Sequence, residues 1–133
     1  MTEKKENRFS KAERLCRKTV VEKLYAEGDS VAAYPLRAVY LTLEPEEGEP
    51  TASILISVSK KRFRHAVDRN LVKRRLREAY RLNKHSFTEA LEAHGTRMAV
   101  AILYLDRQHH PYSHLQARMN KLLHAIIKKE IEK

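Results

Sequence analysis

The spacing of apolar and polar residues along the chain predicts three strands. Residues 36–43 alternate weakly and are rich in side chains that favour β-structure, while residues 52–59 alternate cleanly. Residues 98–105 are apolar on both faces, which is typical of a strand buried inside a sheet. The stretch between the first two strands is acidic and contains proline and glycine, so we expect these strands to form an antiparallel hairpin.

Apolar residues at intervals of three and four predict the helices. A capping box at Ser10 and Glu13 begins the first helix, and Gly28 ends it. Gly95 closes a later short helix, and Pro111 precedes the last one. The expected helices cover residues 10–27, residues 66 to about 84, residues 86–94, and a stretch that begins near residue 111. The apolar stripe of the last helix is expected to contain Leu115, Met119, Leu122, Leu123, Ile126 and Ile127.

The order of these elements indicates one α+β domain. Helices and strands follow as α-β-β-α-β-α, with no long linker, internal repeat or low-complexity tract. We expect an α/β sandwich in which helices pack on a mixed sheet, formed by residues 1–133, with residues 1–9 flexible. The chain has 42% hydrophobic residues, enough for a core without a disulfide, and its one cysteine, Cys16, has no partner in the chain.

Positive charge is concentrated in one segment. The chain has 27 Lys and Arg against 17 Asp and Glu, a net charge of +10, and residues 60–84 alone hold eleven basic and two acidic residues. Helical periodicity gathers most of these cations on one side of the predicted helix. Such a face is typical of proteins that bind nucleic-acid phosphates. The alternative is a solvated surface helix, but those faces usually mix both signs of charge.

The basic side of this helix is the main candidate site. Arg69, Lys73 and Arg77 are four residues apart and form a row along the helix. Asn70 lies among them and could bond a base edge or a 2′-hydroxyl, or be an ordinary surface residue. The basic side also contains Arg74, Arg81 and Lys84. The apolar side is expected to contain Val67, Leu71, Val72, Leu76, Ala79 and Leu82.

A second basic group precedes the helix, and two tyrosines are candidates for stacking on bases. The expected start of the helix is crowded by Lys60, Lys61, Arg62 and Arg64. Cations at a helix N-terminus are unfavourable unless an anion binds there. Tyr25 and Tyr40 could stack on unpaired bases, although a tyrosine on a helix or strand more often packs in the core.

No pattern indicates a protein catalyst, a metal centre or a membrane span. His110 and His114 have the spacing of helical metal ligands, but Pro111 lies between them and no third ligand is near in sequence. No nucleophile–histidine–acid grouping or phosphate-cradling glycine loop stands out. The longest apolar run is eight residues and the N-terminus has no apolar stretch. We therefore expect a soluble cytoplasmic protein that binds RNA and does not cut it alone.

One segment resembles the protein subunit of bacterial ribonuclease P. Ser57-Val-Ser-Lys-Lys leads to Ala66-Val-Asp-Arg-Asn-Leu-Val-Lys-Arg-Arg-Leu-Arg77, which is similar to the family's helix Ala-Val-x-Arg-Asn-Arg-x-Lys-Arg-x-x-Arg. The resemblance extends over nearly the whole chain. Leu71 departs from it by replacing an arginine, and Val21 stands where the family has an aromatic residue. The family's glycine before Ala66 is also absent, in a link one residue longer.

The resemblance implies both a fold and a function. It implies a sheet of about four strands with a left-handed β-α-β crossover through the basic helix, where the general rule would give a right-handed one. It implies the accessory protein of an RNA enzyme whose catalytic RNA, with bound Mg²⁺, removes the 5′ leader of precursor tRNA. The protein would hold no cofactor tightly and would bind the RNA as a monomer in a 1:1 ribonucleoprotein.

The resemblance also divides the candidate residues into two sets. The residues expected to bind the catalytic RNA are Arg69, Asn70, Lys73, Arg74, Arg77 and Arg81. The residues expected to bind the leader of precursor tRNA, at a cleft between the first helix and the sheet, are Arg14, Arg17, Tyr25, Leu36, Tyr40, Lys60, Lys61 and Arg62. No residue is expected to be catalytic or to ligate a metal.

Two other functions are compatible with the same pattern of charge. A ribosomal or general RNA-chaperone protein would show little preference for precursor over mature tRNA. A protein-only nuclease that used the histidines and scattered carboxylates would cleave precursor tRNA without any RNA subunit.

Overall fold

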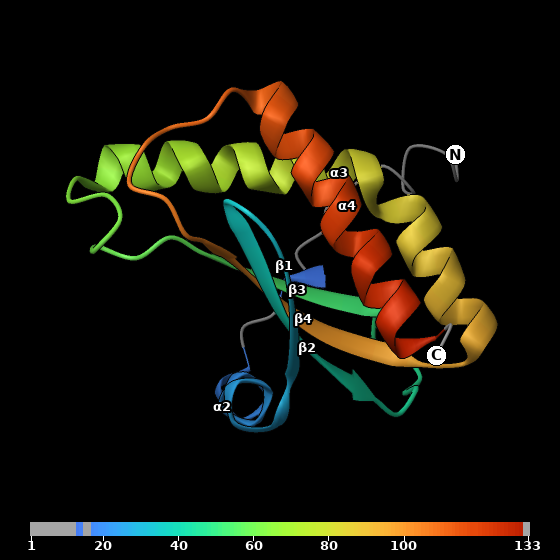
Figure 1. Cartoon of the computed structure of the whole chain (residues 1–133). Coiled ribbons are helices and arrows are strands. Elements are labelled where there is room, and N and C mark those ends of the chain that lie inside the picture. The colour runs from blue at the N-terminus through green and yellow to red at the C-terminus, as the bar shows by residue number, and fades with distance from the viewer. Residues whose placement is uncertain (1–12, 15–16, 132–133) are drawn as a thin grey trace.

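In the computed structural model, which describes residues 13–14 and 17–131, one sheet lies between two layers of helices (Figure 1). The elements follow in the order α2 (Lys18–Glu27), β1 (Asp29–Ala33), β2 (Leu36–Leu43), β3 (Ala52–Ser57), α3 (Ala66–His94), β4 (Arg97–Tyr104) and α4 (Tyr112–Glu130). Helices α3 and α4 pack on one face of the sheet, and α2 packs on the other. The predicted α+β architecture with a mixed sheet of four strands is confirmed.

The strands lie in the order β1-β2-β4-β3. Strand β2 pairs antiparallel with both β1 and β4, while β3 pairs parallel with β4. The predicted hairpin between residues 36–43 and 52–59 is therefore wrong, because β4 lies between these two strands. Strand β4 is apolar on both faces and gains most from the central position, where strands on both sides and helices on both faces cover it.

Strand β1 was not expected from the sequence. Its five residues are small or polar apart from Val31, so they carry little hydrophobic alternation. The strand forms nonetheless, because pairing with β2 extends from Asp29 opposite Tyr40 to Ala33 opposite Leu36. Strands β3 and β4 are parallel neighbours joined by α3, which makes the implied β-α-β unit; the hand of its crossover stays a prediction.

The first described helix is shorter than predicted. Helix α2 begins at Lys18 instead of residue 10, and Ser10 of the proposed capping box lies outside the described residues. Glu13 lies in a 3₁₀ turn, and Arg14 forms a parallel bridge with Ile54 of β3. Arg14 therefore lies beside the outer edge of β3, which would otherwise leave backbone hydrogen-bonding groups unpaired.

The basic helix is longer than predicted. Residues 66–84 and 86–94, expected as two helices, form the single helix α3, which bends near its middle (Figure 1). The Asn83 side-chain amide donates to the carbonyl of Ala79 at 2.7 Å, which competes with the regular backbone bonds of the helix. The helix ends as predicted at Gly95, where φ is 73°.

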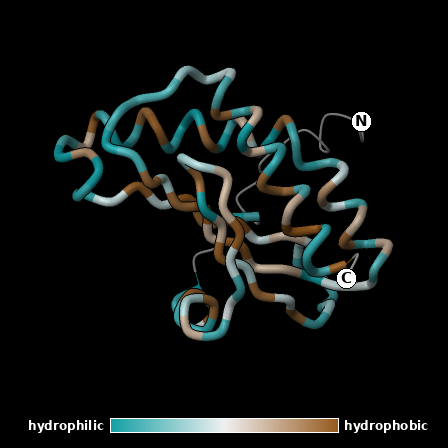
Figure 2. Tube along the Cα trace, viewed as in Figure 1, coloured by the Kyte–Doolittle hydropathy of each residue, from teal (hydrophilic) through white to brown (hydrophobic). Residues whose placement is uncertain are grey.

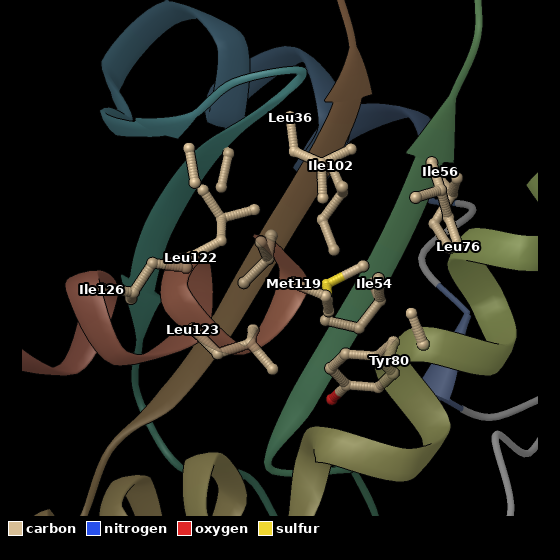
Figure 3. Close-up of a cluster of buried hydrophobic side chains, with 14 of the residues drawn as sticks. Leu36, Ile54, Ile56, Leu76, Tyr80, Ile102, Met119, Leu122, Leu123 and Ile126 are labelled. Carbon is tan, nitrogen blue, oxygen red and sulfur yellow. The ribbon is translucent and has the colours of Figure 1, made fainter. Parts of the chain in front are cut away.

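The main core lies between the sheet and the two helices α3 and α4. Figure 3 shows Leu36, Ile54 and Ile102 from the strands against Met119 and side chains of both helices. Figure 2 shows hydrophobic and hydrophilic stretches alternating along the same helices. The predicted apolar stripe of the last helix is confirmed, with five residues buried: Leu115, Met119, Leu122, Leu123 and Ile126.

A smaller cluster lies on the opposite face of the sheet, under α2. Leu24 is fully buried there against Val39, Ala99 and Ala101. Small side chains on β4 let the helix approach the sheet closely. The chain also turns tightly after α2, since a Cβ atom at Gly28 would lie 2.5 Å from the carbonyl oxygen of Leu24. The sheet is thus fully covered on one face and only partly on the other.

Candidate nucleic-acid interface

The basic face of α3 lies beside the buried stripe of the helix and is open to solvent. Val72, Leu76 and Ala79 are buried against the sheet and α4. Asn70 and Arg74, which do not face this stripe, are exposed. Lys73 and Arg77 are partly buried. Figure 1 shows the N-terminal end of the helix extending past the sheet, beside the links that precede α3 and α4.

Two of the six residues predicted on this face are held by the protein itself. The Nη1 atom of Arg69 donates to the carbonyls of Phe63 and Arg64, each at 2.9 Å, and so closes the link between β3 and α3. Arg81 pairs with Glu78, with Nη2 and Oε2 2.6 Å apart. This pair lowers the pKa of Glu78 and raises that of Arg81. Both arginines thus have a structural role besides any contact with a ligand.

The two sides of the helix differ from prediction at four positions. Lys84, expected on the basic side, is buried and forms an ion pair with Glu13 at 2.9 Å. Val67 and Leu82, expected on the apolar side, are 79% and 45% exposed, and Leu71 is only partly buried. The buried stripe is narrower than the predicted apolar side, so apolar residues at its margin reach the outer surface.

Two residues predicted to bind the leader lie in the core instead. Leu36 and Tyr40 are 0% and 1% exposed and belong to the cluster beneath α3 and α4, where Figure 3 labels Leu36 beside Ile102. Burial, together with the nearby Glu130 and Asp29 carboxylates, raises the pKa of Tyr40 to about 12. The prediction that these two side chains line a cleft between the first helix and the sheet is therefore wrong, because they face away from α2.

The other residues of the leader set lie in three different places. Tyr25 is 48% exposed on α2, and Arg17 precedes that helix and pairs with Glu49 at 2.9 Å. Lys60 and Lys61 are exposed just after β3, followed by the partly buried Arg62. Arg14 lies beside β3 and lines a pocket on α3, so it belongs with the basic helix rather than with α2.

Sequence reasoning missed the side chains that face α2 from the sheet. On β2 these are the exposed Arg37 and the partly buried Leu41 and Leu43. Leu55 and Leu103 extend the same partly covered surface on the neighbouring strands. The alternation in residues 36–43 places Leu36 and Tyr40 on one face of the sheet and these residues of β2 on the other. The alternation alone does not show which of the two faces α2 covers.

A histidine-rich link joins β4 to α4 and contacts the start of α3. His109 lies 3.2 Å from the Asp68 carboxylate, and His110 lies 2.6 Å from that of Asp106. The hydrogen bond from His110 lowers the pKa of Asp106, with further bonds from the backbone N–H groups of the next two residues. His110 and His114 stack with ring centroids 5.2 Å apart. Within the described part of the chain, no group of three or more metal-ligating side chains could hold an ion.

The fold and this surface define a class: a small α+β protein with a cationic helix of the kind that binds polyanions. No helix in the described ranges is long and apolar enough to cross a bilayer. The family model described as Ribonuclease P matches residues 9–127. The chain belongs to the ribonuclease P protein family.

Individual relatives agree with the family match. The chain is 39% identical over 115 residues to the ribonuclease P protein component of Porphyromonas gingivalis, covering 86% of this chain and 83% of that one. It is 32% identical over 129 residues to that of Chlorobium phaeobacteroides, covering 90% and 88%. The structure of the Staphylococcus aureus RNase P protein has the same fold, with a TM-score of 0.66 at 24% identity over 87% of this chain and 96% of that one. Membership of this family assigns the chain to tRNA processing in a ribonucleoprotein.

Proposed function

We propose that this chain is the accessory protein of a ribonuclease P whose catalysis is carried by its RNA. It binds the catalytic RNA through α3 and helps that RNA hydrolyse precursor tRNA in the cytoplasm, which releases the 5′ leader. The observation that carries the proposal is the basic face of α3, where Lys73, Arg74 and Arg77 form no ion pair with another described residue. Cations that the fold leaves unpaired are suited to neutralise phosphates.

The RNA supplies the reacting groups and holds the Mg²⁺ in this proposal, and the protein supplies positive charge. Each phosphate that a lysine or arginine neutralises releases counterions, so affinity falls steeply as salt rises. With six to eight contacts we expect a log–log slope of roughly −4 to −7 for binding to the catalytic RNA. A slope shallower than about −2 would contradict the basic helix as the binding surface.

The leader of precursor tRNA binds on the α2 side of the sheet in this proposal. Tyr25 offers a half-exposed ring for stacking, and Lys60 and Lys61 offer charge at the end of β3. Arg37, exposed on the same side of β2, adds a cation that the sequence did not single out. A surface of aromatic and cationic groups holds single strands with little sequence preference, as leaders of many sequences require.

The proposal is tested by cleavage of a precursor tRNA at low Mg²⁺ with bacterial catalytic RNA, with this protein, or with both. We expect strong stimulation when both are present and no cleavage by the protein alone. Cleavage by the protein alone would favour a protein-only nuclease. Absence of stimulation, with a folded protein and a matched RNA, would favour a general RNA-binding protein.

Matched variants connect the assay to the surface. Lys73→Gln combined with Arg77→Gln should weaken binding to the catalytic RNA and make the salt slope shallower by about 2. Lys121→Gln combined with Lys128→Gln removes the same charge from exposed positions on α4 and should change neither. Tyr25→Ala should reduce the preference for precursor over mature tRNA, while Tyr25→Phe, which keeps the ring, should retain it.

A further inference from the structure

A pocket of about 670 Å³ opens on the outer side of α3. Five arginines line it, four from α3 and one, Arg14, from the segment beside β3. Glu78 is the one acidic residue among the described side chains of its wall, so the wall carries a net positive charge. Pockets of this size commonly hold one small ligand or one group of a larger partner.

The charges of this wall are only partly used inside the protein. Glu78 pairs with Arg81, its hydrogen-bond partner at 2.6 and 3.0 Å. Arg74 and Arg77 form no hydrogen bond or ion pair with any residue in the described part of the chain. Both are positioned to receive an anion from solvent, since guanidinium groups grip phosphate oxygens with two hydrogen bonds.

Two side chains make the pocket more than a phosphate site. Leu71 and Tyr112, the first residue of α4, give it an apolar and aromatic wall. The hydroxyl of Tyr112 is buried and has no hydrogen-bond partner among the described residues. A buried hydroxyl without a partner is unfavourable, and a ligand with a polar edge would supply the missing hydrogen bond. A phosphate alone would use neither the leucine nor the ring, whereas a nucleobase has an apolar face and a polar edge.

We propose that this pocket binds one unpaired nucleotide of the catalytic RNA, with its base against Leu71 and Tyr112 and the adjacent phosphates on Arg74 and Arg77. The inference rests on the proposed function, because it names a specific contact within that complex. It also gives a reason for leucine at a position where the related family motif has arginine. The leucine replaces one phosphate contact by an apolar surface for a base.

The test compares two substitutions on the same outer side of α3. Leu71→Ala removes the apolar wall, and Leu82→Ala makes the same change at an exposed residue that does not line the pocket. We expect Leu71→Ala to weaken binding of the catalytic RNA about tenfold at every salt concentration, without changing the salt slope. Leu82→Ala should bind like the wild type. Circular dichroism of both variants checks that the fold is kept.

Footprinting of the RNA locates the contact. Acylation of 2′-hydroxyls should reveal one unpaired nucleotide that the wild-type protein protects and that Leu71→Ala leaves reactive. A second variant, Tyr112→Leu, should expose the same nucleotide. The pocket could instead bind a free nucleotide, which has the same chemistry. Adenosine monophosphate titrated against the protein alone tests this, and we expect no saturable binding below the millimolar range.

The outcomes separate this inference from the proposed function. If the wild type binds and stimulates the RNA while Leu71→Ala behaves like Leu82→Ala and no footprint changes, the pocket proposal is overturned and the function stands. If adenosine monophosphate saturates the pocket at micromolar concentration and the RNA footprint does not depend on Leu71, the pocket serves a free nucleotide and the proposal is again wrong. If the wild type neither binds nor stimulates the RNA, the proposed function itself fails.

Discussion

The two ends of α3 are held in different ways. The C-terminal half buries Tyr80, Phe87 and Leu91 against the sheet and α4, each at most 2% exposed. In the first turns, residues 66–71, no side chain is buried. This end extends past the sheet (Figure 1) and is held by polar contacts, chiefly from Arg69 to the preceding link.

The cations of α3 also differ along the helix, in whether they have an acidic partner. Lys84 and Arg81, towards the C-terminal half, are paired with Glu13 and Glu78. Lys73, Arg74 and Arg77 have no acidic partner among the described residues. Apolar burial therefore fixes one end of the helix, which allows the other to present charge that the fold does not need. The number of basic residues in a segment does not distinguish these two roles.

The largest effect on stability should come from shortening a side chain in the buried C-terminal half of α3. Phe87→Ala should lower the free energy of unfolding by about 3–5 kcal/mol, because it leaves a cavity beneath α3. Val67→Ala, at a side chain 79% exposed, should change it by less than about 0.5 kcal/mol. Urea unfolding followed by circular dichroism measures both. Similar losses in the two variants would show that the ends are packed alike.

The ion pair of Lys84 should have the next largest effect. Its side chain is 7% exposed and that of Glu13 is 15% exposed, so Glu13→Ala removes a carboxylate that balances a buried charge and should cost about 3 kcal/mol. Adding Lys84→Met to that variant should restore most of the loss, since the buried charge is then gone. Lys73→Met, at a cation without such a partner, should alter stability little. If the double variant were no more stable than Glu13→Ala, the cost would lie in the N-terminal segment rather than in the charge.

Some features of the molecule could be predicted from the sequence and others could not. The bounds of β2 and the apolar stripe of α4 follow from local periodicity, and the structure confirms both. The concentration of charge in residues 60–84 was equally visible. The local pattern of a segment shows how its own side chains are distributed. That is enough to predict a helix or strand, but not which other elements pack against it.

The errors in strand order, in the burial of Lys84 and in the placing of Leu36 and Tyr40 concern contacts between segments that are distant in sequence. The order of strands depends on β4, which is separated from β2 by more than fifty residues yet pairs with all of it. The burial of Lys84 depends on Glu13, 71 positions earlier. Leu36 and Tyr40 were assigned to the wrong face because alternation defines two faces of a strand, and only the packing of α2 and α4 decides which is open.

A smaller, local effect is expected where the exposed end of α3 meets its preceding link. Arg69→Met removes two hydrogen bonds to backbone carbonyls and should lower stability by about 1–2 kcal/mol. Hydrogen exchange should quicken mainly in residues 59–70, because the rest of the helix is fixed by its core contacts. Arg74→Met, an exposed arginine of the same helix, is the control and should leave exchange unchanged. Faster exchange throughout α3 would mean that its two ends unfold together.

The smallest effect is a dependence on pH in the link that contacts the exposed end. The hydrogen bond from His110 holds the pKa of Asp106 below its ordinary value of 3.8. The folded protein therefore binds a proton at this carboxyl less readily than the unfolded chain does. The resulting stabilisation is complete above the ordinary pKa and is lost as the pH falls through the lower, folded value.

Asp106→Asn removes this titration, so the difference in stability between wild type and variant should shrink as the pH falls below 3.8. Unfolding curves at a series of pH values measure it, and Glu47→Gln, at an exposed residue of the acidic turn, corrects for the loss of one negative charge. A difference that stayed constant, or grew, towards acid would show that the carboxylate does not stabilise the link. If the difference shrinks, the polar contacts at the exposed end of α3 weaken in acid while the packing of its buried end does not. The two halves of the helix would then differ in their dependence on pH as well as in their packing.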